Sequence, residues 1–188
     1  MKPCSALFLD RDGVINIDHG YVCSVERTNF IDGIFTLVRI ANEAEYLVVV
    51  VTNQAGIARG YYTEEQFHKY MRWMRSEFAR NGARIDAVFH CPHHPTEGIG
   101  SYLRECSCRK PAPGMILEAK NVFDLNLACS VLLGDKESDI QAGIAAGVGT
   151  NIRLGSEEFP DLWRVSEFLR KGRESGCGHG MNTMPKSS

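Results

Sequence analysis

Two aspartates, Asp10 and Asp12, stand one residue apart directly after a short apolar segment. Two carboxylates this close repel each other, and a divalent cation relieves that repulsion. Magnesium prefers oxygen ligands beside phosphate. The pair therefore predicts phosphoryl transfer, with an aspartyl-phosphate intermediate on Asp10 and with Asp12 as acid and base at the leaving alcohol and the attacking water. Asp12 would contact the metal through its backbone carbonyl, which leaves its carboxyl group free.

Three further polar groups could complete such a site. Thr52 and Asn53 end the apolar run LVVVV and can donate hydrogen bonds to phosphoryl oxygens. Lys110 can offset the negative charge of the transition state. Asp135 can join the aspartate pair in a magnesium shell, and Asp139, one helical turn further on, could hold a metal water or orient Lys110. Each motif alone also occurs in ordinary solvated turns, so the prediction depends on their combination.

A second metal site is indicated by three cysteines and one histidine in two pairs of equal spacing: Cys91 and His93, then Cys106 and Cys108. Three thiolates and one imidazole make a closed tetrahedral zinc site, and a closed site is structural. Zinc would hold the loop 91–108, which lacks apolar periodicity and ends just before Lys110. His94 competes with His93 as the fourth ligand, and the matching one-residue spacing favours His93.

These residues need a scaffold that brings them together, and the chain alternates segments typical of strands and of helices. Strands are predicted at 6–9, 47–52, 87–90, 131–133 and 149–153, and helices at 33–42, 63–80, 115–123, 138–146 and 160–169. Thr63 and Gln66 have the spacing of a capping box. The alternation predicts an α/β fold with a Rossmann-like, doubly wound, mostly parallel sheet. Ligands of such folds bind outside the carboxyl ends of the strands, where the polar residues lie.

Length and composition restrict the possible functions. The chain has 188 residues, which suits one domain, expected at 1–172 with a flexible tail at 173–188. The formal net charge of -2 argues against a nucleic-acid partner. No apolar run is long enough to span a membrane, and the start has no signal-peptide layout. A cytoplasmic protein is therefore expected, with cysteines that are free rather than paired in disulfides.

Motifs that follow successive predicted strands resemble the haloacid dehalogenase superfamily in its phosphatase branch, from about residue 7 to residue 151. They are DxD at 10–12, Thr-Asn at 52–53, Lys-Pro at 110–111 and GDxxxD at 134–139. Longer stretches resemble the D-glycero-D-manno-heptose 1,7-bisphosphate 7-phosphatase family, which has a minimal cap. They are LDRDG at 9–13, DHGYV at 18–22, TNQAGIARG at 52–60, CPHHP at 91–95 and CRKPAPGM at 108–115.

This resemblance implies hydrolysis of the C7 phosphate of the bisphosphate, in the biosynthesis of nucleotide-activated heptose for surface polysaccharide. The catalytic residues would be Asp10, Asp12, Thr52 and Lys110. The substrate would be bound by Asp18, His19, Gly20, Tyr21, Thr52, Asn53, Gln54, Ala55, Arg109 and Lys110. Magnesium would be held by Asp10, Asp12 and Asp135, beside Lys136 and Asp139, and zinc by Cys91, His93, Cys106 and Cys108. The guanidinium of Arg109 could bind the distal phosphate in a bidentate manner.

Alternatives remain open at this point. Histidinol-phosphate phosphatases share the aspartates and a similar zinc loop, although DHGYV and the TNQAGIARG loop favour the heptose family. A non-catalytic binding module usually loses Asp10 or a magnesium ligand, and a phosphotransferase or mutase usually carries a larger cap. Ala55 and Val14 depart from the family, which often has serine and threonine there. A monomer is expected, but the sequence decides neither the oligomeric state nor the anomer, the polysaccharide pathway or the role of the tail.

Overall fold

The computed structural model describes residues 4–174 and contains one five-stranded sheet in which all neighbouring strands are parallel. The strands are β1 (Ala6–Leu9), β2 (Leu47–Asn53), β3 (Ala87–Cys91), β4 (Val131–Gly134) and β5 (Thr150–Arg153), in the order β3-β2-β1-β4-β5. In the central register, Phe8 of β1 pairs with Val49 of β2 and with Leu132 of β4. The predicted α/β fold is confirmed.

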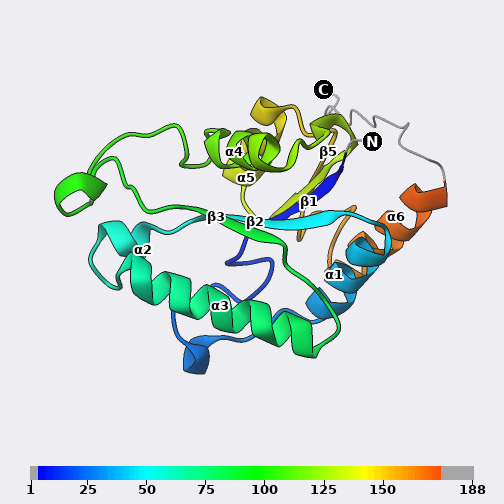
Figure 1. Ribbon diagram of the computed structural model, residues 1–188, viewed down its shortest axis with the longest axis horizontal. Helices are drawn as coiled ribbons and strands as arrows, with labels where there is room; N and C mark the ends of the chain where they lie inside the picture. Colours follow the sequence, from blue (N-terminus) through cyan, green and yellow to red (C-terminus); the bar gives the residue numbers. More distant parts are fainter. Residues whose placement is uncertain (1–3, 175–188) are drawn as a thin grey trace.

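Helices cover both faces of this sheet. They are α1 (Ile34–Glu43), α2 (Ala55–Ala58), α3 (Glu64–Arg80), α4 (Gly114–Phe123), α5 (Glu137–Ala146) and α6 (Leu162–Glu174), with 3-10 turns η1 (Val25–Arg27), η2 (Gly100–Tyr102) and η3 (Leu127–Cys129). Figure 1 shows α1, α3 and α6 on one face and α4 and α5 on the other. Sequence patterns did not predict α2 or the 3-10 turns, because segments this short have no measurable apolar period.

Burial of the sheet on both faces follows from the alternation of side chains along a strand. Leu7 and Leu9 belong to the core beneath α1, α3 and α6, whereas Ala6 and Phe8 belong to the core beneath α4 and α5. All four residues of β1 are buried, which is why this strand is apolar throughout. The central strand is therefore a rigid support for whatever follows Leu9.

The helix boundaries follow local signals. The capping box at the start of α3 forms as predicted, with the Thr63 hydroxyl accepting from the Gln66 backbone and the Gln66 side chain accepting from the Thr63 backbone. Gly147 ends α5 in the left-handed region at φ 83°. The last helix extends further than predicted, so residues 173 and 174 belong to α6, and the rest of the expected tail lies outside the described residues.

The expectation that every cysteine is free is wrong at Cys129, which is disulfide-bonded. This residue is half-buried in η3, and its sulfur accepts a hydrogen bond from Asn126 Nδ2 at 3.3 Å. The cysteines that are free among the described residues are Cys4, Cys23, Cys91, Cys106 and Cys108. Among the helices of residues 4–174, none is long and apolar enough to cross a membrane.

The strand order places the site. After β3 at one edge, the chain crosses to β4 on the other side of β1, so the carboxyl ends of β2, β1 and β4 are adjacent. This reversal of strand order opens a crevice at the carboxyl end of the sheet, where doubly wound folds bind ligands. The long connection between β3 and α4 extends away from the sheet (Figure 1) and returns to this same end at Lys110.

Candidate active site

Asp10 is the first residue after β1 and is buried. Its backbone N–H donates to the Leu133 carbonyl of the adjacent strand at 3.0 Å, which fixes the backbone at this point. Its carboxylate Oδ1 accepts a hydrogen bond from the Lys110 Nζ at 2.8 Å. The predicted nucleophile is thus held at the crevice of the sheet with a cation in direct contact.

Lys110 is a buried cation with three oxygen partners. Its Nζ lies 2.8 Å from Asp10 Oδ1, 2.8 Å from the Val51 carbonyl oxygen and 2.7 Å from Asp139 Oδ1. Burial by itself would lower the pKa of this lysine, but the neighbouring Asp10 and Asp139 carboxylates raise it above its ordinary value. Lys110 therefore stays charged, and Asp139 orients it, which is one of the two arrangements expected for Asp139.

Three carboxylates, from Asp10, Asp135 and Asp139, place oxygen atoms within 4.8 Å of one another. Asp135 Oδ1 is buried and has no hydrogen-bond partner in the described part of the chain. Burial and the nearby Asp10 raise the pKa of Asp135 to about 6. Three carboxylates facing one lysine leave negative charge uncompensated, and a hard divalent cation such as magnesium fits this set of oxygens.

Gly13 makes this approach of carboxylates possible. A Cβ at position 13 would collide with the Asp135 carboxylate, and the backbone there has φ 96°, a region that side-chain-bearing residues rarely adopt. The glycine after the aspartate pair therefore leaves room for the acidic side chain that directly follows β4.

The Asp12 carboxyl group, which is expected to stay free of the metal, is bonded to three side chains. Its carboxylate accepts hydrogen bonds from Arg11 Nη2 at 2.6 Å, Asn16 Nδ2 at 2.9 Å and Gln54 Nε2 at 3.4 Å. Arg11 is fully buried and lies against the Tyr70 ring at 5.3 Å from its centroid. The sequence pattern does not reveal this engagement, because Asn16 and Gln54 carry no motif of their own for it. These contacts hold the Asp12 carboxylate at Arg11, Asn16 and Gln54.

The end of β2 supplies a second set of polar contacts. Asn53 Nδ2 donates to the Lys110 carbonyl and Asn53 Oδ1 accepts from the Lys110 backbone N–H, both at 3.0 Å. The expected role of Asn53 as a phosphate donor is thus accompanied by a role in holding the lysine loop. Thr52 Oγ1 accepts from Gln54 Nε2 at 2.8 Å, and Gln54 Oε1 accepts from the Tyr62 hydroxyl at 2.7 Å.

A cavity of about 570 Å³ lies at the carboxyl end of the sheet, beside Asp10 and Lys110. It is lined by Asp10, Asp12, Asp18, Gly20, Tyr21, Thr52, Asn53, Gln54, Ala55, Tyr62, Arg109, Lys110, Lys136, Ser138 and Asp139. His19 is the predicted substrate residue that does not line it, since its exposed ring contacts Asn29 instead. Tyr62 and Ser138 were not predicted, because a tyrosine in a loop and a serine at a helix start are common without any function.

An ion pair between Lys136 and Asp18 stabilises one wall of this cavity. Lys136 Nζ lies 3.1 Å from Asp18 Oδ2, although both groups are partly exposed. Burial acts to raise the pKa of Asp18, but hydrogen bonds from the Gly20 N–H and Lys136 lower it overall. The loop that carries Asp18 is thereby tied to the start of α5, next to Asp135.

The predicted zinc ligands also meet in space. The Cys91, Cys106 and Cys108 sulfurs lie 3.1 to 3.4 Å apart, and His93 Nδ1 lies 3.5 Å from Cys108 Sγ and 3.8 Å from Cys91 Sγ. The alternative ligand His94 points elsewhere, since its Nδ1 accepts from the Glu97 backbone N–H at 3.0 Å. The donor set of three thiols and one imidazole fits a tetrahedral zinc ion.

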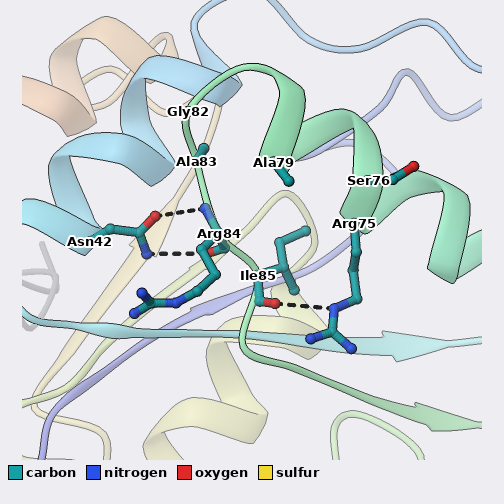
Figure 2. A pocket seen from close by; sticks show the side chains of 8 residues that line it. All are labelled: Asn42, Arg75, Ser76, Ala79, Gly82, Ala83, Arg84 and Ile85. Atoms are coloured by element: carbon teal, nitrogen blue, oxygen red, sulfur yellow. Dashed lines mark hydrogen bonds between the residues drawn. The ribbon is translucent and has the colours of Figure 1, made fainter.

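A second cavity, of about 580 Å³, lies before the start of β3, at the opposite end of the strand from the catalytic residues (Figure 2). It is lined by Asn42, Arg75, Ser76, Ala79, Gly82, Ala83, Arg84 and Ile85. Asn42 bonds both the N–H and the carbonyl of Arg84, at 2.7 and 3.1 Å, and Arg75 Nε donates to the Ile85 carbonyl at 3.1 Å. These contacts join α1 and α3 to the segment that precedes β3.

Comparisons with known proteins find similar sequences and one similar family model. A HAD-hydrolase-like family model matches residues 107–152. The D-glycero-alpha-D-manno-heptose-1,7-bisphosphate 7-phosphatase of Burkholderia mallei is 59% identical over 149 residues, 79% of each chain. The D-glycero-beta-D-manno-heptose-1,7-bisphosphate 7-phosphatase of Vibrio cholerae serotype O1 is 51% identical over 151 residues, 80% of each chain.

A solved structure has a similar fold. The D,D-heptose 1,7-bisphosphate phosphatase from B. bronchiseptica, in complex with magnesium and phosphate, superposes with a TM-score of 0.77 at 30% identity. The alignment covers 89% of the present chain and 98% of that chain. The similarity therefore extends over most of the length of both chains.

Proposed function

This chain belongs to the D-glycero-D-manno-heptose 1,7-bisphosphate 7-phosphatase family of the haloacid dehalogenase superfamily, and on that premise we propose that it hydrolyses the C7 phosphate of this bisphosphate. The observation that carries the proposal is the meeting of Asp10, Lys110 and Asp135 at one crevice. These residues come from three distant parts of the chain, and together they supply a nucleophile, a cation and a metal-binding oxygen.

The residues of the chain divide the reaction into two steps. Asp10 attacks phosphorus, the bond from phosphorus to the sugar oxygen breaks, and Asp12 donates its proton to that oxygen. Water then attacks the phosphoryl group on Asp10, Asp12 accepts the proton, and orthophosphate and the free Asp10 carboxylate result. Lys110 stays charged throughout and stabilises the phosphoryl oxygens. When bound by the carboxylates of Asp10 and Asp135, with the Asp12 backbone, magnesium would neutralise the charge between nucleophile and phosphate.

Recognition of a bisphosphate requires positive charge away from the reacting phosphate. Arg109 lines the cavity and its Nη1 donates to the His93 carbonyl at 3.2 Å, which joins the guanidinium to the cysteine cluster. We assign the distal C1 phosphate to Arg109 and the sugar to the wall formed by Asp18, Gly20, Tyr21 and Ala55. We assign zinc to the cysteine cluster, where it would hold this loop in place.

The cellular role follows from the chemistry of the product. Removal of the C7 phosphate leaves a sugar 1-phosphate, which a nucleotidyltransferase can activate for surface polysaccharide. We propose a cytoplasmic, monomeric enzyme with one catalytic domain, expected at 1–172 from the sequence and extended to residue 174 by α6. Histidinol phosphate, a monophosphate, would leave the Arg109 end of the cavity without a partner.

The test is a comparison of kcat/KM with magnesium for both anomers of heptose 1,7-bisphosphate and for histidinol phosphate. The expected result is a preference of at least 100-fold for one heptose anomer over histidinol phosphate. The relatives act on different anomers, so both have to be measured. A preference for histidinol phosphate would overturn the substrate assignment but leave the proposed mechanism unchanged.

The variant Asp10→Asn tests the nucleophile. Because an amide cannot form the acyl phosphate, turnover should fall by at least 1,000-fold while the far-UV circular dichroism stays unchanged. Asp124→Asn is the matched control, since Asp124 is exposed at the left-handed end of α4, where asparagine is well accommodated. Retained activity in Asp10→Asn would contradict the assignment.

A further inference from the structure

A cluster outside both the catalytic cavity and the cysteine cluster contains Glu64, His68 and His90. Glu64 is the first residue of α3, His68 follows one helical turn later, and His90 lies in β3. One ligand atom from each lies within 4.8 Å of the other two, and His90 Nε2 is 3.4 Å from Glu64 Oε2. Residues four apart on a helix share one face, so the helix presents Glu64 and His68 together to the strand.

The His90 ring carries an unsatisfied polar atom. Its Nε2 is buried without a hydrogen-bond partner among the described residues, even though the Glu64 carboxylate is near. The ring is held by Phe67, with centroids 4.6 Å apart, and meets His68 edge to face with centroids 5.1 Å apart. Buried polar atoms are rarely left without a partner, and a cation between the imidazoles and the carboxylate would supply one.

The remaining groups are arranged as in a metal site. Glu64 Oε1 accepts a hydrogen bond from the Tyr102 hydroxyl at 2.8 Å, which orients the carboxylate and leaves Oε2 facing His90. Such outer contacts commonly fix metal ligands. His68 is exposed, so its ring has room to adjust toward the other two ligand atoms, and water can fill the other positions.

We propose that Glu64, His68 and His90 form a second transition-metal site, which binds zinc through two imidazoles and one carboxylate. Imidazole ligands select zinc, nickel, copper or iron over magnesium. The ion would join the start of α3 to β3 and, through Tyr102, to the loop that carries the cysteine cluster. The other explanation for the contact is a histidine–glutamate pair without metal.

The test uses the full-length protein with one zinc in the cysteine cluster and an excess of magnesium, which blocks the catalytic carboxylates. Titration calorimetry with zinc should show one additional ion per chain at micromolar zinc. Glu64→Gln and His68→Ala should weaken this binding at least tenfold. Glu65→Gln, the exposed neighbour of Glu64 on α3, should bind as the wild type does.

A further variant separates the two clusters. Cys106→Ser should lose the ion of the cysteine cluster and keep the ion at Glu64, His68 and His90. Equal affinity in the wild type, Glu64→Gln and His68→Ala would overturn the proposal, because zinc would then bind elsewhere. If zinc half-saturates this cluster only at millimolar concentration, the result would be an adventitious ion only, and the proposal would also be overturned.

Discussion

At the scale of single residues, the candidate active site carries an excess of negative charge. Asp10, Asp135 and Asp139 face one another, and Lys110 compensates only part of their charge. Lys110 contacts Asp10 and Asp139, whereas Asp135 Oδ1 has no hydrogen-bond partner in the described part of the chain. The ionisation of Asp135 is thus unfavourable, and we expect a bound magnesium ion to relieve it.

Asp135→Asn should therefore stabilise the protein in magnesium-free buffer while abolishing its activity. The asparagine removes a half-buried charge next to Asp10, and after allowance for solvent screening we expect a gain of about 1–2 kcal/mol at pH 8. Thermal unfolding with and without magnesium checks this. Magnesium should raise the unfolding temperature of the wild type only. A variant less stable than the wild type at pH 8 without magnesium would contradict the assignment.

The same carboxyl group predicts a dependence of stability on pH. Its pKa in the folded chain, about 6, is above the ordinary value of 3.8, so the folded state binds more protons between these values. The contribution of Asp135 to stability in magnesium-free buffer is then greatest below about pH 4 and is lost as the pH rises through about 6. The advantage of Asp135→Asn over the wild type should shrink accordingly when unfolding is measured from pH 8 down to pH 5.

Arg109→Ala tests recognition of the distal phosphate. The loss of a charge-assisted contact of about 1.5–3 kcal/mol should lower kcat/KM for the bisphosphate at least tenfold, and lower it much less for a monophosphate substrate. Arg164→Ala, which removes an exposed arginine paired with Glu167 on α6, is the control. An equal loss on both substrates would show that Arg109 acts on the loop rather than on the distal phosphate.

At the scale of elements, the connection from β3 to α4 is the unusual part of the fold. It carries the cysteine cluster and then Lys110, whose backbone is held on both sides by the Asn53 amide at the end of β2. A Cβ at Gly114, the first residue of α4, would collide with the Ser107 carbonyl, so the helix starts in close contact with this loop. The cluster and the amide together place the lysine beside Asp10.

Cys106→Ser should lower zinc content and thermal stability together. Three ligands bind zinc more weakly than four, and without the ion nothing bonds Cys91 and His93 to Cys108 across the loop as strongly. We expect the cluster to lose its zinc on dialysis, the unfolding temperature to fall by several degrees and kcat to fall because Lys110 is displaced. Elemental analysis and calorimetry measure the first two. Cys4→Ser, at a free and half-buried thiol outside the cluster, is the control. If Cys106→Ser retained all of the zinc in the cluster, the assignment of Cys106 as a zinc ligand would be wrong.

At the scale of the whole molecule, one sheet serves both helical layers. The side chains of β1, β2 and β4 alternate between the two cores, so neither layer can lose its packing without exposing the other face of the same strands. Helix α6 packs on α1, which makes the end of the described chain part of this unit. We therefore expect the described residues to unfold as one cooperative domain.

Unfolding by guanidinium chloride should accordingly occur in one transition. Fluorescence of Trp73 on α3 and Trp163 on α6 reports on one layer, and far-UV circular dichroism reports on all helices. With zinc and magnesium present, the two curves should have the same midpoint, because the layers share the sheet. Two separate midpoints would contradict a single domain.

The sequence alone determined the fold class, the strands and the polar residues at their carboxyl ends. Those properties depend on neighbours in the chain: apolar runs predict buried strands, and the residues that follow a buried strand must lie at the edge of the sheet. The one-residue spacings also favoured His93 over His94, and His93 is the histidine that meets the cysteines. The site roles themselves remain predictions until the variants are measured.

Only the tertiary structure decided the contacts between distant residues. The pairing of Lys110 with Asp10 and Asp139, the engagement of Asp12 by Arg11 and Asn16, and the meeting of Glu64, His68 and His90 have no local signature. Such contacts depend on the crossing of the chain between sheet edges and on the helix face that packs on each strand. Periodicity specifies which face of an element is buried, but the positions of polar side chains from separate elements follow only when all elements are packed.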